Sequence, residues 1–154
     1  MAEGLTHAEL CRFLEAQAPF LQAMGIRCEE SRPGYAVARW RQDPRWIRPG
    51  GYLCGGGLMT LADAALYMAI LSQIGLQAMA VTSELKMNFL RPAVGGDVLA
   101  RARLLKLGRR LAYGEIHLLM ADGGEKLVAH ATSSYALPDA EANGAGPAGS
   151  RITG

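Results

Sequence analysis

A long apolar stretch near the middle of the chain, GGYLCGGGLMTLADAALYMAIL, predicts a buried helix over residues 55–74 that ends at Gly75. Asp63 lies within it, and no other Asp, Glu, Lys, Arg or His occurs between Arg48 and Glu84. A helix that is apolar on every side belongs in a protein core, where a lone carboxylate is costly unless it is paired, hydrogen-bonded or protonated. Asp63 is therefore a candidate functional residue.

The pattern on either side of this helix predicts one short helix and six strands. Thr6 can cap the short helix, with Glu9 at the capping-box position, and Pro19 ends or kinks it. Strand-like alternation covers residues 24–30, 34–40, 80–89, 97–107, 110–121 and 126–137. The last two strands form a hairpin over Asp122-Gly123-Gly124. In the third strand, one face is expected to carry Val81, Ser83, Leu85, Met87 and Phe89.

A helix that is apolar all round needs a sheet wrapped around it. Five or six antiparallel strands curling round one helix provide this, which predicts an α+β fold. The edges of such a sheet stay uncovered, and pairing with a second copy of the chain would cover them. Residues 1–22 are expected to form an N-terminal helical segment and residues 23–138 the main domain. The Ala-, Gly- and Pro-rich composition of residues 139–154 predicts a disordered tail.

Composition narrows the function classes. The 154 residues are 50% hydrophobic and 19% charged, with a formal net charge of +2, as in one ordinary globular domain. The longest basic run is Arg109–Arg110, so we expect no nucleic-acid partner, and Asp63 and the glycines argue against a membrane span. Three cysteines without metal-ligand spacing and an N-terminus unlike a secretory signal favour a reduced, cytoplasmic setting. His7, His117 and His130 are scattered over predicted elements, so no metal is expected.

The start of the central helix and Asp63 could both serve a reaction in which a nucleophile attacks and negative charge develops. Unpaired N–H groups at a helix N-terminus stabilise a developing negative charge, and a carboxylate in an apolar pocket can activate water or attack directly. Gly55 and Asp63 are eight residues apart, which is ~12 Å along one helix. One helix therefore cannot bring both to the same reacting group. Two antiparallel helices from two subunits can, which predicts a homodimer with composite sites.

Three motifs in order resemble one known family. The segment CGGGLMTLAD, residues 54–63, resembles the HGG…TLxD signature of hotdog-fold acyl-CoA thioesterases of the PaaI type, which are 4-hydroxybenzoyl-CoA thioesterase-like. The second motif, TSELKMNFLRPA, covers residues 82–93 and is followed by Gly95. The third is Gly108-Arg109-Arg110, followed by Gly123 and by LVA at residues 127–129.

This resemblance implies the hotdog fold and hydrolysis of an acyl- or aryl-CoA thioester. It makes Asp63 the general base or nucleophile, assigns polarisation of the thioester carbonyl to the Gly55 N–H, and gives an assisting hydroxyl to Thr82. It implies no metal or redox cofactor, and it agrees with a homodimer that can pair into a dimer of dimers, a homotetramer. The alternative is a non-catalytic acyl-CoA-binding or regulatory hotdog protein that has lost hydrolysis.

The sequence departs from the family pattern at two positions. Cys54 stands where the signature His is expected, and Arg48 replaces a polar amide six residues earlier. The thiol is a weaker donor than imidazole, so a weakened activity is expected. The candidate substrate-binding residues are Arg48, Cys54, Gly56, Tyr67, Arg91, Arg109 and Arg110. The arginines could contact the phosphates of CoA or be solvated charges. Thr82 and Tyr67 could be packing residues, and Asp63 could be structural, paired with Arg48 or with a backbone donor of the partner subunit.

Overall fold

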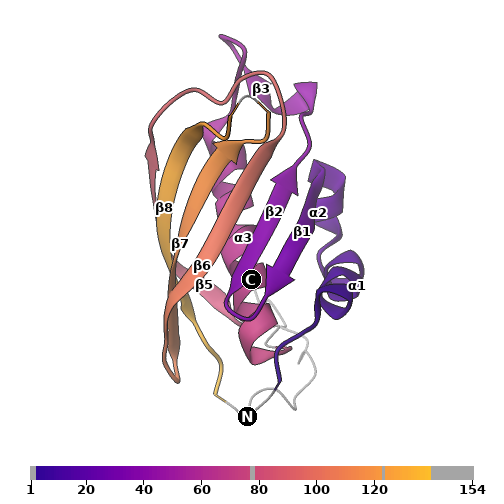
Figure 1. Cartoon of the computed structure of the whole chain (residues 1–154), viewed down its shortest axis with the longest axis vertical. Coiled ribbons are helices and arrows are strands. Elements are labelled where there is room, and N and C mark those ends of the chain that lie inside the picture. Colours follow the sequence, from indigo (N-terminus) through magenta and orange to yellow (C-terminus); the bar gives the residue numbers. More distant parts are fainter. Residues whose placement is uncertain (1–2, 77–78, 123, 140–154) are drawn as a thin grey trace, which may run out of the picture.

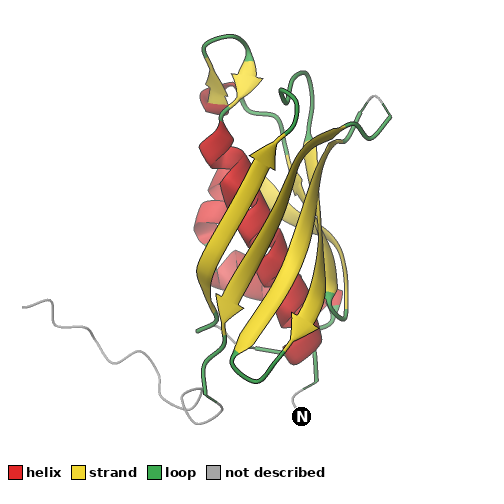
Figure 2. Ribbon diagram, turned by 90° about the vertical axis from the view of Figure 1, so that its left-hand side faces the viewer, coloured by secondary structure: helices red, strands yellow, loops and turns green. Residues whose placement is uncertain are grey.

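The computed structural model describes residues 3–76, 79–122 and 124–139 and contains the central helix at its predicted bounds. This helix, α3 (Gly55–Ile74), runs along one face of a curved sheet (Figures 1 and 2). It ends at Gly75, whose φ of 80° is readily adopted by glycine. By length and composition α3 could cross a membrane, but 67% of that window is buried inside the protein, as expected of a core helix.

Six antiparallel strands cover α3, which confirms the expected α+β arrangement. Their order across the sheet is β1-β2-β6-β7-β8-β5, so β1 and β5 form the two edges (Figure 1). Their bounds are β1 (Ile26–Arg32), β2 (Tyr35–Trp40), β5 (Val81–Phe89), β6 (Val98–Leu107), β7 (Leu111–Met120) and β8 (Leu127–Ala136). Each lies within two residues of its predicted position. The predicted hairpin is also present, since β7 and β8 are neighbours; Gly123 and residues 140–154 of the predicted tail lie outside the described residues.

Two short helices precede the sheet. In α1 (His7–Gln17), Thr6 and Glu9 form the predicted capping box, with the Thr6 N–H donating to Glu9 Oε2 at 2.8 Å. Pro19 ends this helix as expected, but it also begins a second one, α2 (Pro19–Met24), at a position where proline is well tolerated. Both helices lie beside β1 (Figure 1).

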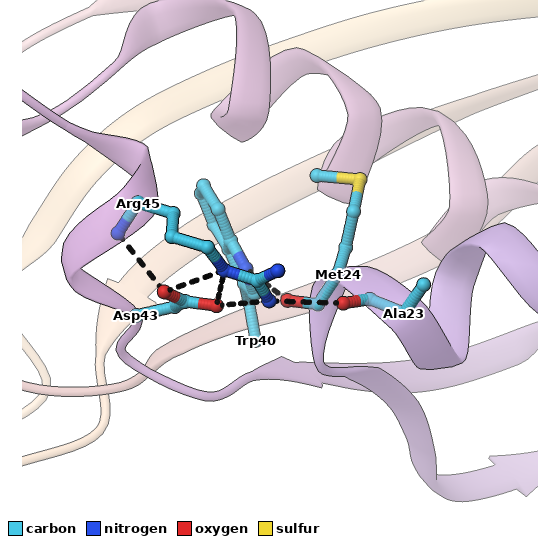
Figure 3. Close-up of polar contacts among 5 residues, drawn as sticks. All are labelled: Ala23, Met24, Trp40, Asp43 and Arg45. Atoms are coloured by element: carbon cyan, nitrogen blue, oxygen red, sulfur yellow. Dashed lines mark hydrogen bonds and ion pairs between the residues drawn. The ribbon is translucent and has the colours of Figure 1, made fainter.

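The segment between β2 and α3 contains short regular elements. It contains a 3₁₀ turn, η1 (Pro44–Trp46), and a small two-stranded sheet of β3 (Ile47–Arg48) and β4 (Tyr52–Leu53). Asp43 accepts a hydrogen bond from the backbone N–H of Arg45 at 2.9 Å, and the Arg45 guanidinium reaches the carbonyl of Ala23 at 3.4 Å (Figure 3). These contacts tie the end of α2 to the segment that leads into α3.

Trp40 fixes the start of α3 against the sheet. Its side chain is 1% exposed, and its indole N–H donates to the Met24 carbonyl at 3.0 Å (Figure 3). A Cβ added to Gly57 would lie 2.2 Å from the Trp40 ring. The first turn of α3 can therefore approach β2 this closely only because residue 57 is glycine.

The predicted facing of β5 is wrong over its first residues. The register between β5 and β8 shifts between Thr82 and Glu84. Such a bulge inserts one extra residue and reverses the alternation on one side of it. Thr82, Leu85 and Met87 thus face α3, whereas Val81 is 55% exposed.

Candidate functional site

Asp63 lies in the middle of α3 and is held by two hydroxyl groups. Its Oδ1 accepts a hydrogen bond from the Thr82 hydroxyl at 2.6 Å and another from the Tyr135 hydroxyl at 2.6 Å. The Tyr135 hydroxyl also lies 2.8 Å from the backbone carbonyl oxygen of Asp63. Within the described part of this chain, the side-chain partners of Asp63 are these two hydroxyls and not Arg48, which is exposed on β3.

Sheet register brings the two hydroxyls to Asp63. Thr82 on β5 and Tyr135 on β8 are directly paired across the two strands, so both side chains leave the same face of the sheet. The bulge after Thr82 is what turns that residue toward α3 while Leu85 keeps its inward position. Two strands and one helix thus converge on a single carboxylate.

The tyrosines beside Asp63 stay protonated. Burial raises the pKa of Tyr135, and the neighbouring Asp63 charge raises it further because it disfavours a phenolate. Tyr67 stacks on Tyr135, with ring centroids 6.2 Å apart and planes 17° from parallel, and burial raises the pKa of Tyr67 as well. Tyr135 is therefore a hydrogen-bond donor to Asp63 at neutral pH.

Asp63 opens onto a cavity of about 450 Å³ between α1, α2, α3 and the β5 edge. Most of its walls are apolar or aromatic, and two of its polar residues, Thr82 and Tyr135, donate hydrogen bonds to Asp63. The lining side chains include Phe13, Gln17, Phe20 and Leu21 from the N-terminal helices, and Thr60, Tyr67, Thr82 and Tyr135 around the carboxylate. A mostly apolar cavity with a few convergent polar groups is typical of a small-molecule site.

The other predicted catalytic groups lie at the start of α3. Cys54 is the N-cap residue and makes no side-chain capping hydrogen bond. Gly56 borders open space, and the Phe89 ring lies 3.3 Å from where a Cβ on Gly55 would be. None of these three residues lines the Asp63 cavity of the same chain. The structure therefore brings Asp63, Thr82 and Tyr67 together and keeps the helix start apart from them.

The four candidate arginines also lie away from this cavity. Arg48, Arg91 and Arg109 are exposed, and Arg110 makes an exposed ion pair with Asp139 at 3.6 Å. Exposed ion pairs contribute little to stability. Their assignment to substrate phosphates stays a prediction.

Sequence reasoning missed Tyr135 and the contribution of the N-terminal helices. Tyr135 contacts Asp63 only because β5 pairs with β8 in one particular register. Phe13 and Gln17 reach the cavity because α1 packs beside the sheet. The residues next to these positions in the sequence do not predict either contact. The only relevant feature of the sequence is a tyrosine in the last predicted strand.

Comparison with known proteins identifies what the chain is similar to. The family model described as "Thioesterase superfamily" matches residues 50–127. A curated esterase-like protein of Pseudomonas aeruginosa is 36% identical over 124 residues, which is 79% of this chain and 90% of that protein. The crystal structure of a thioesterase-like protein from a Silicibacter species is 35% identical, with a TM-score of 0.79 over 90% of this chain and 95% of the other.

A second solved structure is a mutant of the phenylacetic acid degradation protein PaaI from Thermus thermophilus. It is 30% identical, with a TM-score of 0.68, and the match covers 77% of this chain and 97% of that one. The motif-based expectation of a PaaI-type relationship is thereby confirmed.

Proposed function

The chain belongs to the thioesterase superfamily and has its hotdog fold, and we propose that it hydrolyses an acyl- or aryl-CoA thioester to the free acid and CoA. The observation that carries this proposal is the Asp63 carboxylate, held by Thr82 and Tyr135 at the wall of an aromatic-lined cavity. The two hydroxyls orient the carboxylate while it keeps lone pairs for a water molecule or for attack on the substrate.

The reaction needs a nucleophile and a place for negative charge. Asp63 takes a proton from water as the water oxygen bonds to the thioester carbonyl carbon. Alternatively, the carboxylate attacks that carbon itself and forms an acyl-Asp63 anhydride, which a water molecule then hydrolyses to the free acid, restoring Asp63 and supplying the proton for the thiolate. The carbonyl oxygen becomes an oxyanion, which N–H groups at a helix start stabilise. The C–S bond then breaks, and the CoA sulfur leaves as a thiolate that takes up the proton.

The oxyanion donor comes from a second copy of the chain. Gly55 lies ~12 Å from Asp63 along α3, too far to serve the same thioester. Large apolar side chains are exposed along and beyond the β5 edge: Met79, Val81, Phe89, Leu90 and Val94. Pairing two β5 edges about a two-fold axis covers these side chains and runs the two α3 helices antiparallel. Gly55 of the partner subunit then approaches Asp63, and a pair of such dimers forms the tetramer.

The substrate is held at both ends. Its acyl group enters the cavity beside Tyr67, and the exposed arginines at positions 48, 91, 109 and 110 bind the CoA phosphates. Cys54 and Gly56 border the thioester from the helix start. Because Cys54 donates weakly where family members carry His, Cys54→His is expected to raise kcat/KM.

The primary experiment measures free thiol released from a panel of aromatic and short- to long-chain acyl-CoAs. Asp63→Asn keeps an acceptor oxygen for Thr82 and Tyr135 but removes the base, so kcat/KM should fall by about 10²–10⁴. Asp122→Asn removes an exposed carboxylate outside the cavity and is the matched control. Binding of CoA esters without turnover by wild type would refute hydrolysis and favour the non-catalytic binding protein.

A complementation experiment tests the composite site. Asp63→Asn and Gly55→Val are each expected to be inactive as homodimers. A heterodimer of the two, purified through two different tags, has one site carrying both changes and one site carrying neither. It should recover about half of wild-type activity, whereas sites built within single chains would leave the heterodimer inactive.

A further inference from the structure

Three metal-binding side chains meet where α1 packs on β1, away from the Asp63 cavity. His7 and Cys11 are one turn apart on α1, and Cys28 lies on β1. The Cys11 sulfur lies 3.6 Å from His7 Nε2, and the Cys28 sulfur lies 3.9 Å from His7 Nδ1. One ring nitrogen and the two sulfurs all lie within 4.8 Å of one another.

These distances are close to those of a tetrahedral zinc site. With Zn–S near 2.3 Å and Zn–N near 2.0–2.1 Å, ligand atoms lie roughly 3.5–3.8 Å apart. The distance from the Cys11 sulfur to His7 Nε2 already fits. Since one ring nitrogen and the two sulfurs lie within 4.8 Å of one another, shifts of about 1 Å would complete the sphere. His7 is exposed and can make such a shift. A donor set of two thiols and an imidazole binds zinc in preference to calcium or magnesium.

The surroundings provide a supporting contact for His7 and open space beside the two cysteines. His7 Nδ1 lies 3.0 Å from the Ser31 hydroxyl, so with that nitrogen protonated, Nε2 is the one directed at the metal. Glu15 is one further turn along α1 and shares with Cys11 and Cys28 the lining of a cavity of about 520 Å³. That cavity has room for a water molecule at the fourth position. The Glu15 carboxylate lies outside the group of three and would reach that position only by a change of rotamer.

A second group of metal-binding side chains fits a cation less well. Glu115, His117 and His130 lie together on β7 and β8. The Glu115 carboxylate already accepts a hydrogen bond from the Arg103 guanidinium at 2.8 Å. The Arg103 guanidinium repels a cation, and it already binds Glu115, which is the only carboxylate of the group.

We propose that His7, Cys11 and Cys28 bind one Zn²⁺ ion, with Glu15 or a water molecule as the fourth ligand. Sequence spacing predicted no such site, because Cys28 joins the group only through the packing of α1 on β1. The ion would clamp the N-terminal helices to the edge of the sheet. Since Phe13 and Gln17 of α1 line the Asp63 cavity, the clamp would also fix one wall of that cavity.

The test uses the full chain, kept reduced and freed of metal with a chelator. Zn²⁺ affinity is measured by competition with a chromophoric chelator, and Co²⁺ serves as the spectroscopic probe of thiolate ligation. Wild type should bind one equivalent per chain, with a sulfur-to-cobalt charge-transfer band. His7→Gln, an exposed change that should not disturb folding, should weaken Zn²⁺ binding by about 10-fold or more. Cys28→Ser should diminish the charge-transfer band.

Two control variants separate this site from other ligands in the chain. Cys54→Ser removes the third thiol, and His130→Gln disrupts the group on β7 and β8; both should bind Zn²⁺ as wild type does. Zn²⁺ should also raise the Tm of wild type and of Cys54→Ser, but not that of His7→Gln. No binding by wild type, equal binding by His7→Gln, or loss of binding in either control would overturn the proposal. None of these readouts depends on thioesterase activity.

Discussion

Replacing Gly57 by alanine tests how closely α3 must approach the sheet. The added Cβ would lie 2.2, 2.9 and 3.1 Å from three atoms of the Trp40 ring, whereas carbon atoms pack best at about 3.5–4.0 Å. The ring would have to move by more than about 1 Å. It has little freedom to do so, since it is 1% exposed and its N–H is bound to the Met24 carbonyl.

The expected cost follows from two opposing effects. Overfilling a packed core costs about 1–3 kcal/mol, and replacing glycine by alanine in a helix returns about 0.5–1 kcal/mol. Gly57→Ala should therefore lower the free energy of unfolding by about 1–2 kcal/mol, which corresponds to a fall in Tm of roughly 2–8 °C for a chain of this size.

Gly56→Ala is the matched control. Its added Cβ would meet no atom within 4 Å, so only the gain in helix propensity remains, and its stability should equal or exceed that of wild type. Both variants are compared by urea denaturation at one protein concentration. If Gly57→Ala proves as stable as Gly56→Ala, the Trp40 contact does not constrain the start of α3, and the packing argument fails.

Two further predictions concern the hydroxyls at Asp63. Because the pKa of Tyr135 is raised in the folded protein, the folded state holds the phenol proton more tightly than the unfolded state. The protonated phenol therefore contributes its full share to the free energy of unfolding below about pH 10, and this contribution declines as the pH rises further. Tyr135→Phe should show a shallower loss of stability between pH 9 and 11 than wild type, measured by urea denaturation, and an identical pH dependence would contradict this. Thr82→Val keeps the side-chain shape but removes the donor to Asp63, so kcat/KM should fall by roughly 10–100-fold, measured by thiol release. Ser83→Ala, whose hydroxyl donates to the Ser134 carbonyl instead, should retain wild-type kcat/KM, and a loss of equal size there would exclude a specific role for Thr82.

The features that the sequence predicted are those determined within a few neighbouring residues. The capping box of Thr6 and Glu9 and the bounds of α3 depend on local hydrogen bonds, helix propensity and a glycine stop, and all are confirmed. Asp63 was recognisable because it is the one charge in a long apolar segment. Such signals require no knowledge of which strands are neighbours.

The missed features depend on contacts between distant segments. Thr82 was named as a candidate through the family resemblance, but the bulge that turns it toward Asp63 was not foreseen. Tyr135 reaches the same carboxylate through a strand register that links positions more than fifty residues apart. The proximity of Cys11 and Cys28 likewise follows from the packing of a helix on an edge strand. Periodicity carries no information on these pairings.

The bend between α1 and α2 separates two cavities. Ala18 and Leu21 line both the Asp63 cavity and the cavity beside Cys28. These helices lie outside residues 50–127, the part that the family model matches. Asp63 and the part of the cavity wall formed by α1 and α2 therefore occupy separable stretches of sequence. Under the proposed function, exchanging residues 7–24 between relatives would change this part of the wall, and with it the acyl-chain preference, without altering Asp63 or the strands that hold it.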